Sequence, residues 1–185
     1  MLSISKTINN NIRIIDKDLF AKITIPVSRA LKLNNLRMFR PYILNNYPKH
    51  LDDCLGKLLC HMKIIGDNTY LQFLNNFSDG LYCSFTLEVS PSKKGIYMIL
   101  LSDEVVYIGR TIKSFRTRIN NGYGRLSPMQ TLRRRGATNC RINKELSRVD
   151  GIVQWQFINM TCDEEIIKTE VKMIKSLKPK WNIKI

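Results

Sequence analysis

Residues 95–109 have the sequence GIYMILLSDEVVYIG and decide the fold of the C-terminal half of the chain. Two runs of aliphatic and aromatic residues, 95–101 and 105–109, flank a short polar stretch. This arrangement predicts a β-hairpin whose turn spans residues 102–104. The predicted cross-strand pairs are Leu101 with Val105, Ile99 with Tyr107, and Tyr97 with Gly109.

Tyr97 and Tyr107 should share one face of this hairpin, because side chains alternate between the two faces of a strand. Gly109 has no side chain, which would leave room beside Tyr97 for a ligand to approach. Tyrosine is also an ordinary strand residue, so the hairpin by itself favours packing over catalysis.

The residues after the hairpin predict a helix, a strand and a second helix. A short helix should begin near Ser114, and an Arg-rich polar stretch follows it. A strand is expected from Val153 to Ile158. The final helix should open with Asp163-Glu164-Glu165 and end before Pro179, because acidic residues favour a helix N-terminus and proline ends a helix.

The residues before the hairpin are mainly helical in pattern. Residues 28–39 predict a basic amphipathic helix, and residues 50–65 predict another. Residues 81–89 alternate apolar with polar side chains, which predicts a strand with one buried face. We therefore expect an α+β chain whose N-terminal extension is mainly helical.

A change of composition at Pro91-Ser92-Lys93-Lys94 predicts a domain boundary. Residues 91–185 carry 19 basic and 8 acidic side chains, whereas residues 1–90 carry 11 and 7. The whole chain of 185 residues has a net charge of +15 and is 44% hydrophobic, enough to form a core. This charge favours a nucleic-acid partner; a ribosomal or membrane-surface protein, or solubilising charge, are the alternatives.

Five cysteines are present, and none forms a CxxC pair. Their spacing from the two histidines fits no usual zinc motif, so ordinary buried thiols of a reducing compartment are expected. The N-terminus lacks the apolar region of a signal peptide, and no apolar run is long enough to span a bilayer. We therefore expect a soluble cytoplasmic protein with no membrane partner.

Glu170 has an unusual position on the final helix. At 100° per residue from Ile166 it falls at about 40°, in the middle of an apolar stripe that includes Ile174. The lysines at 168, 172 and 175 fall on the opposite face. A buried carboxylate needs a cation, a donor or a proton, so Glu170 indicates either a structural salt bridge to an arginine or a functional site.

These features together resemble the GIY-YIG nuclease superfamily. Gly95-Ile96-Tyr97 and Tyr107-Ile108-Gly109, with ten residues from one tyrosine to the other, are similar to its two-part signature. Glu170, Lys178-Pro179 and Asn182 follow the spacing of its closing segment. The resemblance covers about half of the chain and implies a three-stranded antiparallel sheet flanked by helices.

The resemblance also implies a chemistry for these residues. Glu170 would be the protein carboxylate on one divalent metal, Mg²⁺ or Mn²⁺, during phosphodiester hydrolysis. Tyr97 would orient or deprotonate the attacking water, which requires nearby positive charge to favour a phenolate. Tyr107 would hold water or phosphate beside it, and Asn182 would support the site by hydrogen bonding.

The family places an arginine on the helix after the second triplet, to stabilise the charge of the pentavalent phosphate. The common spacing falls on Thr117 here, between two arginines. We choose Arg118 and keep Arg116 as the alternative. Some members have a histidine or tyrosine one turn later, where this chain has Gly122. Tyr123, next to it, is expected to be structural or to contact DNA.

Further arginines are candidates for DNA backbone contacts. The alternative is that those of the Arg-rich stretch belong to a solvated loop. The predicted DNA-binding residues are Arg110, Arg116, Arg133, Arg134, Arg135 and Arg141.

The sequence thus predicts a GIY-YIG endonuclease domain at residues 91–185, acting on double-stranded DNA. Residues 1–90 would supply target recognition or dimerisation. A single module with an extension favours a restriction-type enzyme that cuts both strands as a homodimer or by binding twice. The alternatives are a homing or structure-specific repair nuclease and a catalytically inactive DNA-binding module.

Overall fold

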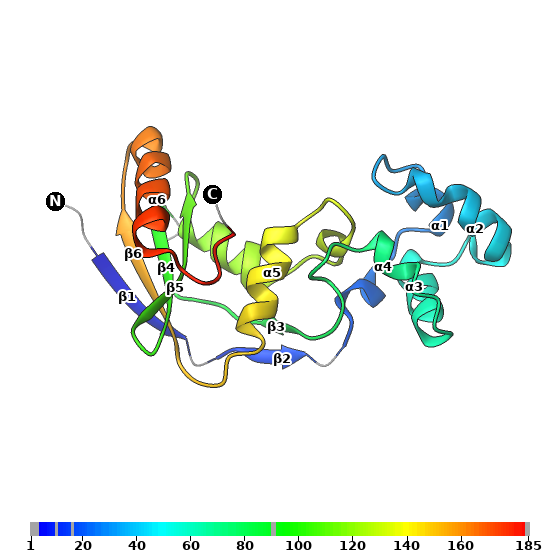
Figure 1. Ribbon diagram of the computed structural model, residues 1–185, viewed down its shortest axis with the longest axis horizontal. Coiled ribbons are helices and arrows are strands. Elements are labelled where there is room, and N and C mark those ends of the chain that lie inside the picture. Colours follow the sequence, from blue (N-terminus) through cyan, green and yellow to red (C-terminus); the bar gives the residue numbers. More distant parts are fainter. Residues whose placement is uncertain (1–3, 10, 16, 90–91, 184–185) are drawn as a thin grey trace. The chain divides into compact units, whose positions relative to one another are not determined.

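The computed structural model describes residues 4–9, 11–15, 17–89 and 92–183 (Figure 1). The chain forms two compact units. Unit 1 comprises the described residues of the ranges 1–13, 83–125 and 145–185, and unit 2 comprises those of 14–82 and 126–144.

The predicted boundary at residues 90 and 91 does not coincide with this division. Residues 4–13 and 83–89 belong to unit 1, whereas residues 126–144 belong to unit 2. Each unit is therefore assembled from segments that are far apart in the sequence, and a linear division of the chain cannot describe either.

Unit 1 contains most of the strands and the longest helix. Its elements are β1 (Ile4–Asn9), β4 (Gly95–Leu101), β5 (Glu104–Thr111), the π-helix η4 (Thr117–Gly124), β6 (Val153–Asn159) and α6 (Asp163–Leu177). Two short strands, β2 (Arg13–Ile15) and β3 (Tyr82–Ser84), form a separate two-stranded sheet.

The main sheet has four strands in the described residues, in the order β1-β6-β4-β5, with every pair antiparallel. The prediction of three strands was wrong, because β1 adds to the outer edge of β6 in a register that runs from Ile4↔Ile158 to Asn9↔Val153. An unpaired edge would leave the β6 backbone groups on that side without partners, and β1 supplies them.

The hairpin of β4 and β5 confirms two predicted pairs and corrects the third. Tyr97 pairs with Gly109, and Ile99 pairs with Tyr107. Leu101 pairs with Glu104 rather than with Val105, since the turn holds two residues, Ser102 and Asp103, with φ of 48° and 65°. Such a turn matches the strand twist, and a register shift after Ile99, opposite Val106, absorbs the extra residue as a β-bulge.

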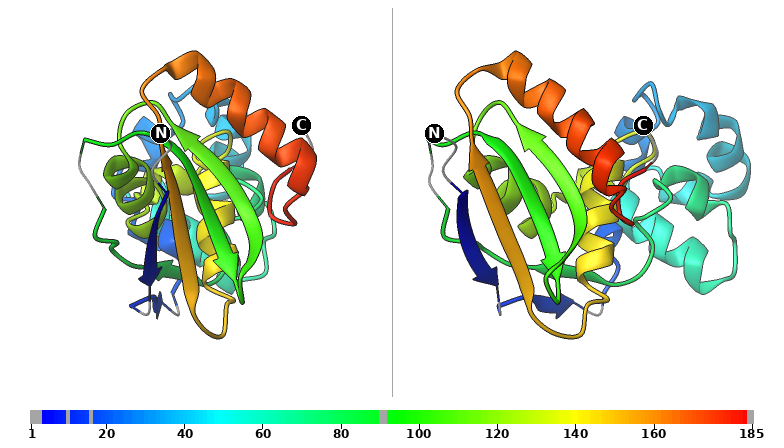
Figure 2. Two further views of the ribbon diagram at one scale, coloured as in Figure 1. Left: turned by 90° about the vertical axis from the view of Figure 1, so that its left-hand side faces the viewer. Right: turned by 60° about the vertical axis from the view of Figure 1, so that its left-hand side comes forward.

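The two faces of this sheet have different cores. Ile96, Met98, Leu100 and Ile108 pack with Ile166 and Ile174 of α6 on one face. Tyr97 and Trp155 face the other way, as alternation along a strand requires, and pack with Phe115 and Tyr123. Figure 2 shows α6 crossing one face of the sheet and η4 lying on the other.

The predicted helix near Ser114 and the predicted strand at residues 153–158 are confirmed, and so is the final helix. The predicted strand at residues 81–89 is shorter than expected. Cys83, Phe85 and Leu87 are buried in alternation, but strand pairing is confined to β3. Leu87 bonds through its backbone to the buried side chain of Asn120 instead.

Unit 2 consists of short helices around one apolar core that includes Phe20, Val27, Phe39, Leu58 and Phe73. Its elements are η1 (Leu19–Lys22), α1 (Val27–Ala30), η2 (Arg37–Phe39), α2 (Arg40–Asn46), η3 (Pro48–His50), α3 (Leu55–Ile64), α4 (Tyr70–Phe73) and η5 (Pro128–Thr131). Helix α5 (Ala137–Leu146) begins in unit 2 and ends in unit 1.

Two predicted helices of this region differ from the structure. The helix predicted at residues 28–39 is interrupted between α1 and η2 by turns at residues 31–36, which include Asn34 and Asn35. The helix predicted at residues 50–65 corresponds to α3 and begins after Cys54. Among the described residues, no helix combines the length and the apolar character needed to cross a bilayer.

Candidate active site

Three tyrosines and one arginine meet on the face of the sheet that carries Tyr97. The Tyr97 and Tyr123 hydroxyls lie 2.7 Å apart, and the Tyr107 hydroxyl lies 3.4 Å from that of Tyr123. Arg118 donates from Nε to the Tyr97 hydroxyl at 3.1 Å and from Nη2 to the Tyr123 hydroxyl at 2.8 Å. Its guanidinium carbon also lies 4.7 Å from the centre of the Tyr123 ring. We call these four residues the tyrosine–arginine cluster.

The helix that carries Arg118 and Tyr123 starts from a local polar contact. The Ser114 Oγ accepts a hydrogen bond from the Thr117 backbone N–H at 3.1 Å, as residues at helix N-termini commonly do. Phe115 and Ile119 are buried and anchor this segment against unit 1. The sequence analysis chose Arg118 and kept Arg116 as the alternative; the structure brings Arg118 into the cluster and leaves Arg116 exposed.

Tyr123 is the member of the cluster that sequence analysis missed. In an α-helix a residue five positions after Arg118 would point about 140° away from it. Residues 117–124 form a π-helix, whose hydrogen bonds join residues five apart, and this brings Tyr123 back towards Arg118. The sequence signal was a tyrosine one position beyond the usual place, which indicates an inserted residue.

Gly109 does not leave an open space beside Tyr97. A Cβ at this position would overlap the Tyr97 ring, which lies directly over the glycine backbone. The predicted role of Gly109 is therefore corrected: the missing side chain makes room for the Tyr97 ring rather than for a ligand. Any larger residue here would displace Tyr97 from Arg118.

The cluster is buried, and its electrostatics follow from that. Tyr97 and Tyr123 are fully buried, and Tyr107 is 5% exposed. Burial raises the pKa of Tyr97 above its ordinary value, and neighbouring Tyr107 adds to the rise, while Arg118 opposes it. Burial likewise raises the pKa of Tyr123. Burial disfavours the charge of Arg118, but the phenols of Tyr97 and Tyr123 keep its pKa raised, so the cluster is a cation held by neutral phenols.

Glu170 lies on α6, on the other face of the sheet from the cluster. Its side chain is 13% exposed, in agreement with its predicted place in the apolar stripe between Ile166 and Ile174. The stripe is narrower than predicted, since Ile167 and Leu177 are 43% and 53% exposed.

The partner that a buried carboxylate requires is Arg110, whose Nη1 donates to Glu170 Oε2 in an ion pair. Arg110 was predicted to contact DNA; its side chain is 40% exposed and pairs with Glu170 here. This is the structural salt bridge that the sequence left open as an alternative. Because β5 carries Arg110 towards α6 and Tyr107 towards the cluster, the two groups of predicted residues are joined through this strand.

The described residues hold no group of three or more His, Cys, Asp or Glu side chains arranged to bind a metal ion. A magnesium ion does not require one, because it commonly uses one or two carboxylates and completes its shell with water and phosphate oxygens. Arg110 takes Glu170 Oε2, and no donor within the described ranges reaches Oε1. The site therefore fits a cation held through one carboxylate oxygen.

Asn182 binds the backbone of β5 rather than a reacting group. Its Oδ1 accepts from the Ile108 N–H at 2.9 Å, and its Nδ2 donates to the Ile108 carbonyl at 2.8 Å. The neighbouring Trp181 N–H donates to the Val106 carbonyl at 2.9 Å. The segment after α6 thus bonds to the outer edge of β5 at Val106 and Ile108, the residues on either side of Tyr107.

The remaining predicted DNA-binding arginines are not part of the cluster. Arg134 and Arg135 are exposed, and Arg133 is half-buried, all in unit 2. Arg141 is 9% exposed, which leaves little of its side chain open for the phosphate contact predicted for it. It lies on α5, and the Arg-rich composition of this stretch did not indicate that one of its arginines would be buried.

No protein-family model and no curated protein matches the chain. Two solved structures are similar to part of it: point-mutant forms of the GIY-YIG N-terminal endonuclease domain of UvrC from Thermotoga maritima, each bound to a catalytic divalent cation. Their sequence identities are 20% and 21%, with a TM-score of 0.35 in both cases. Each comparison covers 52% of this chain and 89% of the other.

Proposed function

We propose that unit 1 is the catalytic module of a metal-dependent DNA endonuclease of the GIY-YIG type. The observation that carries the proposal is the Arg118 guanidinium, held by the hydroxyls of Tyr97 and Tyr123 beside Tyr107. The two signature tyrosines and the arginine chosen from sequence meet at one place, although Arg118 lies 11 positions after Tyr107 in the sequence.

Arg118 is the group that would stabilise the pentavalent phosphate. A guanidinium offers several N–H donors in a plane. In the cluster, Nε donates to Tyr97 and Nη2 donates to Tyr123, and these two hydrogen bonds fix the orientation of the guanidinium. A charge held in place before the reaction needs no reorganisation as negative charge develops on the phosphate. The phenols of Tyr97 and Tyr123 therefore prepare Arg118 for this task.

Tyr97 is the group proposed to orient or deprotonate the attacking water. Its hydroxyl is buried against Arg118 and Tyr123, and burial keeps the phenol protonated near neutral pH. The reaction would require a water to reach this hydroxyl while Arg118 keeps its orientation. The nearby cation would favour loss of the phenolic proton to solvent, and the Tyr97 phenolate would then take a proton from the attacking water.

Glu170 would hold the divalent metal, Mg²⁺ or Mn²⁺, through its carboxylate. The metal would supply positive charge for the phosphate oxygens and acidify a bound water. Arg110 occupies one Glu170 oxygen and is partly exposed, so its release towards a DNA phosphate would free the carboxylate. Asn182 is a positioning residue, since it fixes the β5 backbone at Ile108.

As the finer proposal, the protein is a sequence-specific, restriction-type enzyme that cuts double-stranded DNA as a homodimer or by binding twice, working in the cytoplasm. Arg116, Arg133, Arg134 and Arg135 would contact DNA phosphates. A homing or structure-specific repair nuclease with the same chemistry is the alternative. Cleavage mapping on plasmid and branched DNA distinguishes them: cutting at one short palindrome supports the restriction-type assignment, whereas cutting at junctions supports the alternative.

The decisive experiment is nicking of supercoiled plasmid DNA with and without Mg²⁺. The wild type should convert supercoiled to open-circular or linear DNA in a Mg²⁺-dependent manner. Glu170→Ala should bind DNA normally and fail to cut it. A Glu170→Ala variant that cuts like the wild type would exclude this carboxylate from the reaction.

A second candidate function is a catalytically inactive DNA-binding module. The observation that favours it is the Glu170–Arg110 ion pair, which satisfies the buried carboxylate without any metal. In that case the wild type binds DNA but leaves the plasmid intact at every Mg²⁺ and Mn²⁺ concentration. The same assay thus separates the two candidates.

A further inference from the structure

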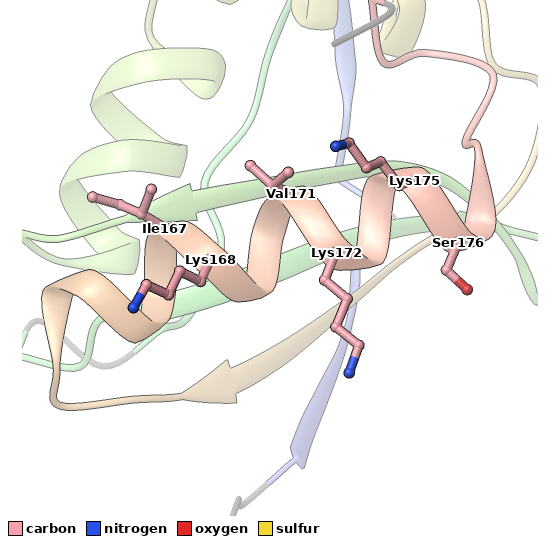
Figure 3. Close-up of a pocket in the computed structure, with 6 residues that line it drawn as sticks. All are labelled: Ile167, Lys168, Val171, Lys172, Lys175 and Ser176. Carbon is pink, nitrogen blue, oxygen red and sulfur yellow. The ribbon is translucent and has the colours of Figure 1, made fainter.

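The outer face of α6 carries a row of lysines. Lys168, Lys172 and Lys175 follow one another at intervals of four and three residues, so they lie on one side of the helix. All three are exposed. Figure 3 shows the side chains of Lys168 and Lys172 extending from one edge of the helix and that of Lys175 from the other edge, one turn further along. We call these three residues the α6 lysine row.

Within the described residues, this row forms no ion pair with a carboxylate. In the described part of the chain, none of the three lysines lies within 4.0 Å of an acidic oxygen, whereas Lys57, Lys63 and Lys94 each form an ion pair. The carboxylate of Glu170, on the same helix, faces inward and pairs with Arg110.

The surface along the row is hollowed. A shallow depression of about 680 Å³ is lined by the row together with Ile167, Val171 and Ser176. A second hollow of about 510 Å³ shares Lys175 and continues past Lys178 and Lys180 to Asn182. Asn182 binds the β5 backbone at Ile108, next to Tyr107. The basic surface therefore leads from the outside of α6 to the strand that carries the site.

We propose that the α6 lysine row binds the phosphate backbone of duplex DNA outside the position of cleavage. This inference rests on the proposed function and adds a binding surface to it. The row spans about 10 Å of helix axis, a length over which one DNA strand carries about three phosphates. Lys178 and Lys180 continue the contact towards the site.

The composition of the surface favours DNA over a protein partner. Lysine is depleted in protein–protein interfaces, and half of the side chains lining the first hollow are lysines. The apolar surface of this hollow, which Ile167, Val171 and the lysine stems line together, covers too small an area for an apolar docking site. An anionic membrane would share the charge complementarity and is therefore included in the test.

The test measures DNA affinity as a function of salt. A labelled duplex of about 30 base pairs is titrated with the full-length protein without divalent metal, at salt between about 50 and 200 mM. The variant Lys168→Gln/Lys172→Gln/Lys175→Gln should lose about 2 to 3 from the slope of log K against log salt. The matched variant with arginine at the same positions should keep the wild-type slope. A control replaces three exposed lysines elsewhere, Lys17, Lys32 and Lys49, with glutamine.

The proposal stands if the α6 glutamine variant loses more of the slope than the control does. It is overturned if the α6 variant keeps the wild-type slope, if both variants lose equally, or if vesicles with anionic lipids, but not DNA, distinguish the α6 variant from the wild type. The failure of the proposed function would look different. A wild type that never cuts plasmid, yet shows the α6-dependent slope, would retain this surface and lose the nuclease.

Discussion

At the scale of single residues, the charge of Arg118 is held where burial opposes it. The cost of burying a guanidinium is offset by hydrogen bonds to two phenols and by contact with the face of the Tyr123 ring. The cost of burying the Glu170 carboxylate is offset differently, by an ion pair with Arg110. One cation is thus surrounded by neutral groups that leave its charge available, whereas one anion already has a counter-ion at one of its two oxygens.

Tyr123→Phe should lower the rate of plasmid nicking by about tenfold, equivalent to about 1.4 kcal/mol of transition-state stabilisation. The change removes the hydroxyl that fixes Nη2 of Arg118 and contacts Tyr97. Because burial raises the Tyr123 pKa, the phenol stays protonated between about pH 6 and pH 9, and the ratio of variant to wild-type rate should not vary in this range. Tyr82→Phe, outside the cluster, is the matched control. A wild-type rate in Tyr123→Phe would contradict this role.

Arg110→Gln tests what the ion pair does. If Arg110 competes with a metal for Glu170, the variant should need less Mg²⁺ for half-maximal nicking, by about threefold or more. Loss of the pair should also lower the free energy of unfolding by about 1–3 kcal/mol, between the values for exposed and buried pairs. Nicking at a series of Mg²⁺ concentrations and a urea titration measure the two effects. Loss of stability without any change in the Mg²⁺ requirement would mean that the pair is structural.

At the scale of elements, two asparagine side chains bond to backbone groups in the way that a neighbouring strand would. Asn182 gives Ile108 both a donor and an acceptor at the free edge of β5, and Asn120 does the same for Leu87 beside η4. An amide side chain carries one C=O and one NH₂, so it can take the place of a neighbouring backbone. These two contacts hold β5 and η4, the elements that position Tyr107, Arg118 and Tyr123.

Asn182→Ala should therefore weaken β5 without touching a reacting group. Two backbone groups of Ile108 lose their partners, which we expect to cost about 1–3 kcal/mol in unfolding free energy. Asn182→Asp keeps the acceptor for the Ile108 N–H and loses the donor to its carbonyl, so its stability should lie between those of Asn182→Ala and the wild type. Chemical denaturation of the three proteins gives this order. Equal stabilities would show that Asn182 contributes nothing to the edge of β5.

At the scale of the whole molecule, the chain is not divided where its composition changes. Unit 1 takes β1 from the N-terminus, and unit 2 takes residues 126–144 from within the C-terminal half. The sheet that carries Tyr97 and Tyr107 therefore depends on residues that precede it by more than 80 positions. The N-terminal segment is therefore part of the main sheet as well as of the extension that was predicted.

A fragment of residues 91–185 should accordingly be less stable than the full chain. It lacks β1, which pairs with β6 from Val153 to Ile158. It also contains residues 126–144 without the rest of unit 2, to which they belong. We expect its melting temperature to be lower by at least about 5 °C. It should also self-associate, because the edge of β6 is left open. Thermal melting followed by circular dichroism and size-exclusion chromatography measure both properties. A monomeric fragment that melts with the full chain would show that β1 is dispensable.

Sequence alone determined the features that depend on local periodicity: the hairpin with Tyr97 opposite Gly109, the strand at 153–158, α6, and the place of Glu170 in its apolar stripe. Such patterns repeat within a few residues and can therefore be recognised from the sequence alone. Tertiary structure decided what depends on contacts between distant segments or on a change of helix type. These are the β1–β6 pairing, the two-unit division, the pairing of Glu170 with Arg110 and the entry of Tyr123 into the cluster through a π-helix. The physical reason is that folding brings many residues near a strand edge or a buried charge, and any of them can become its partner. The separation of two residues along the chain does not indicate whether they will pair.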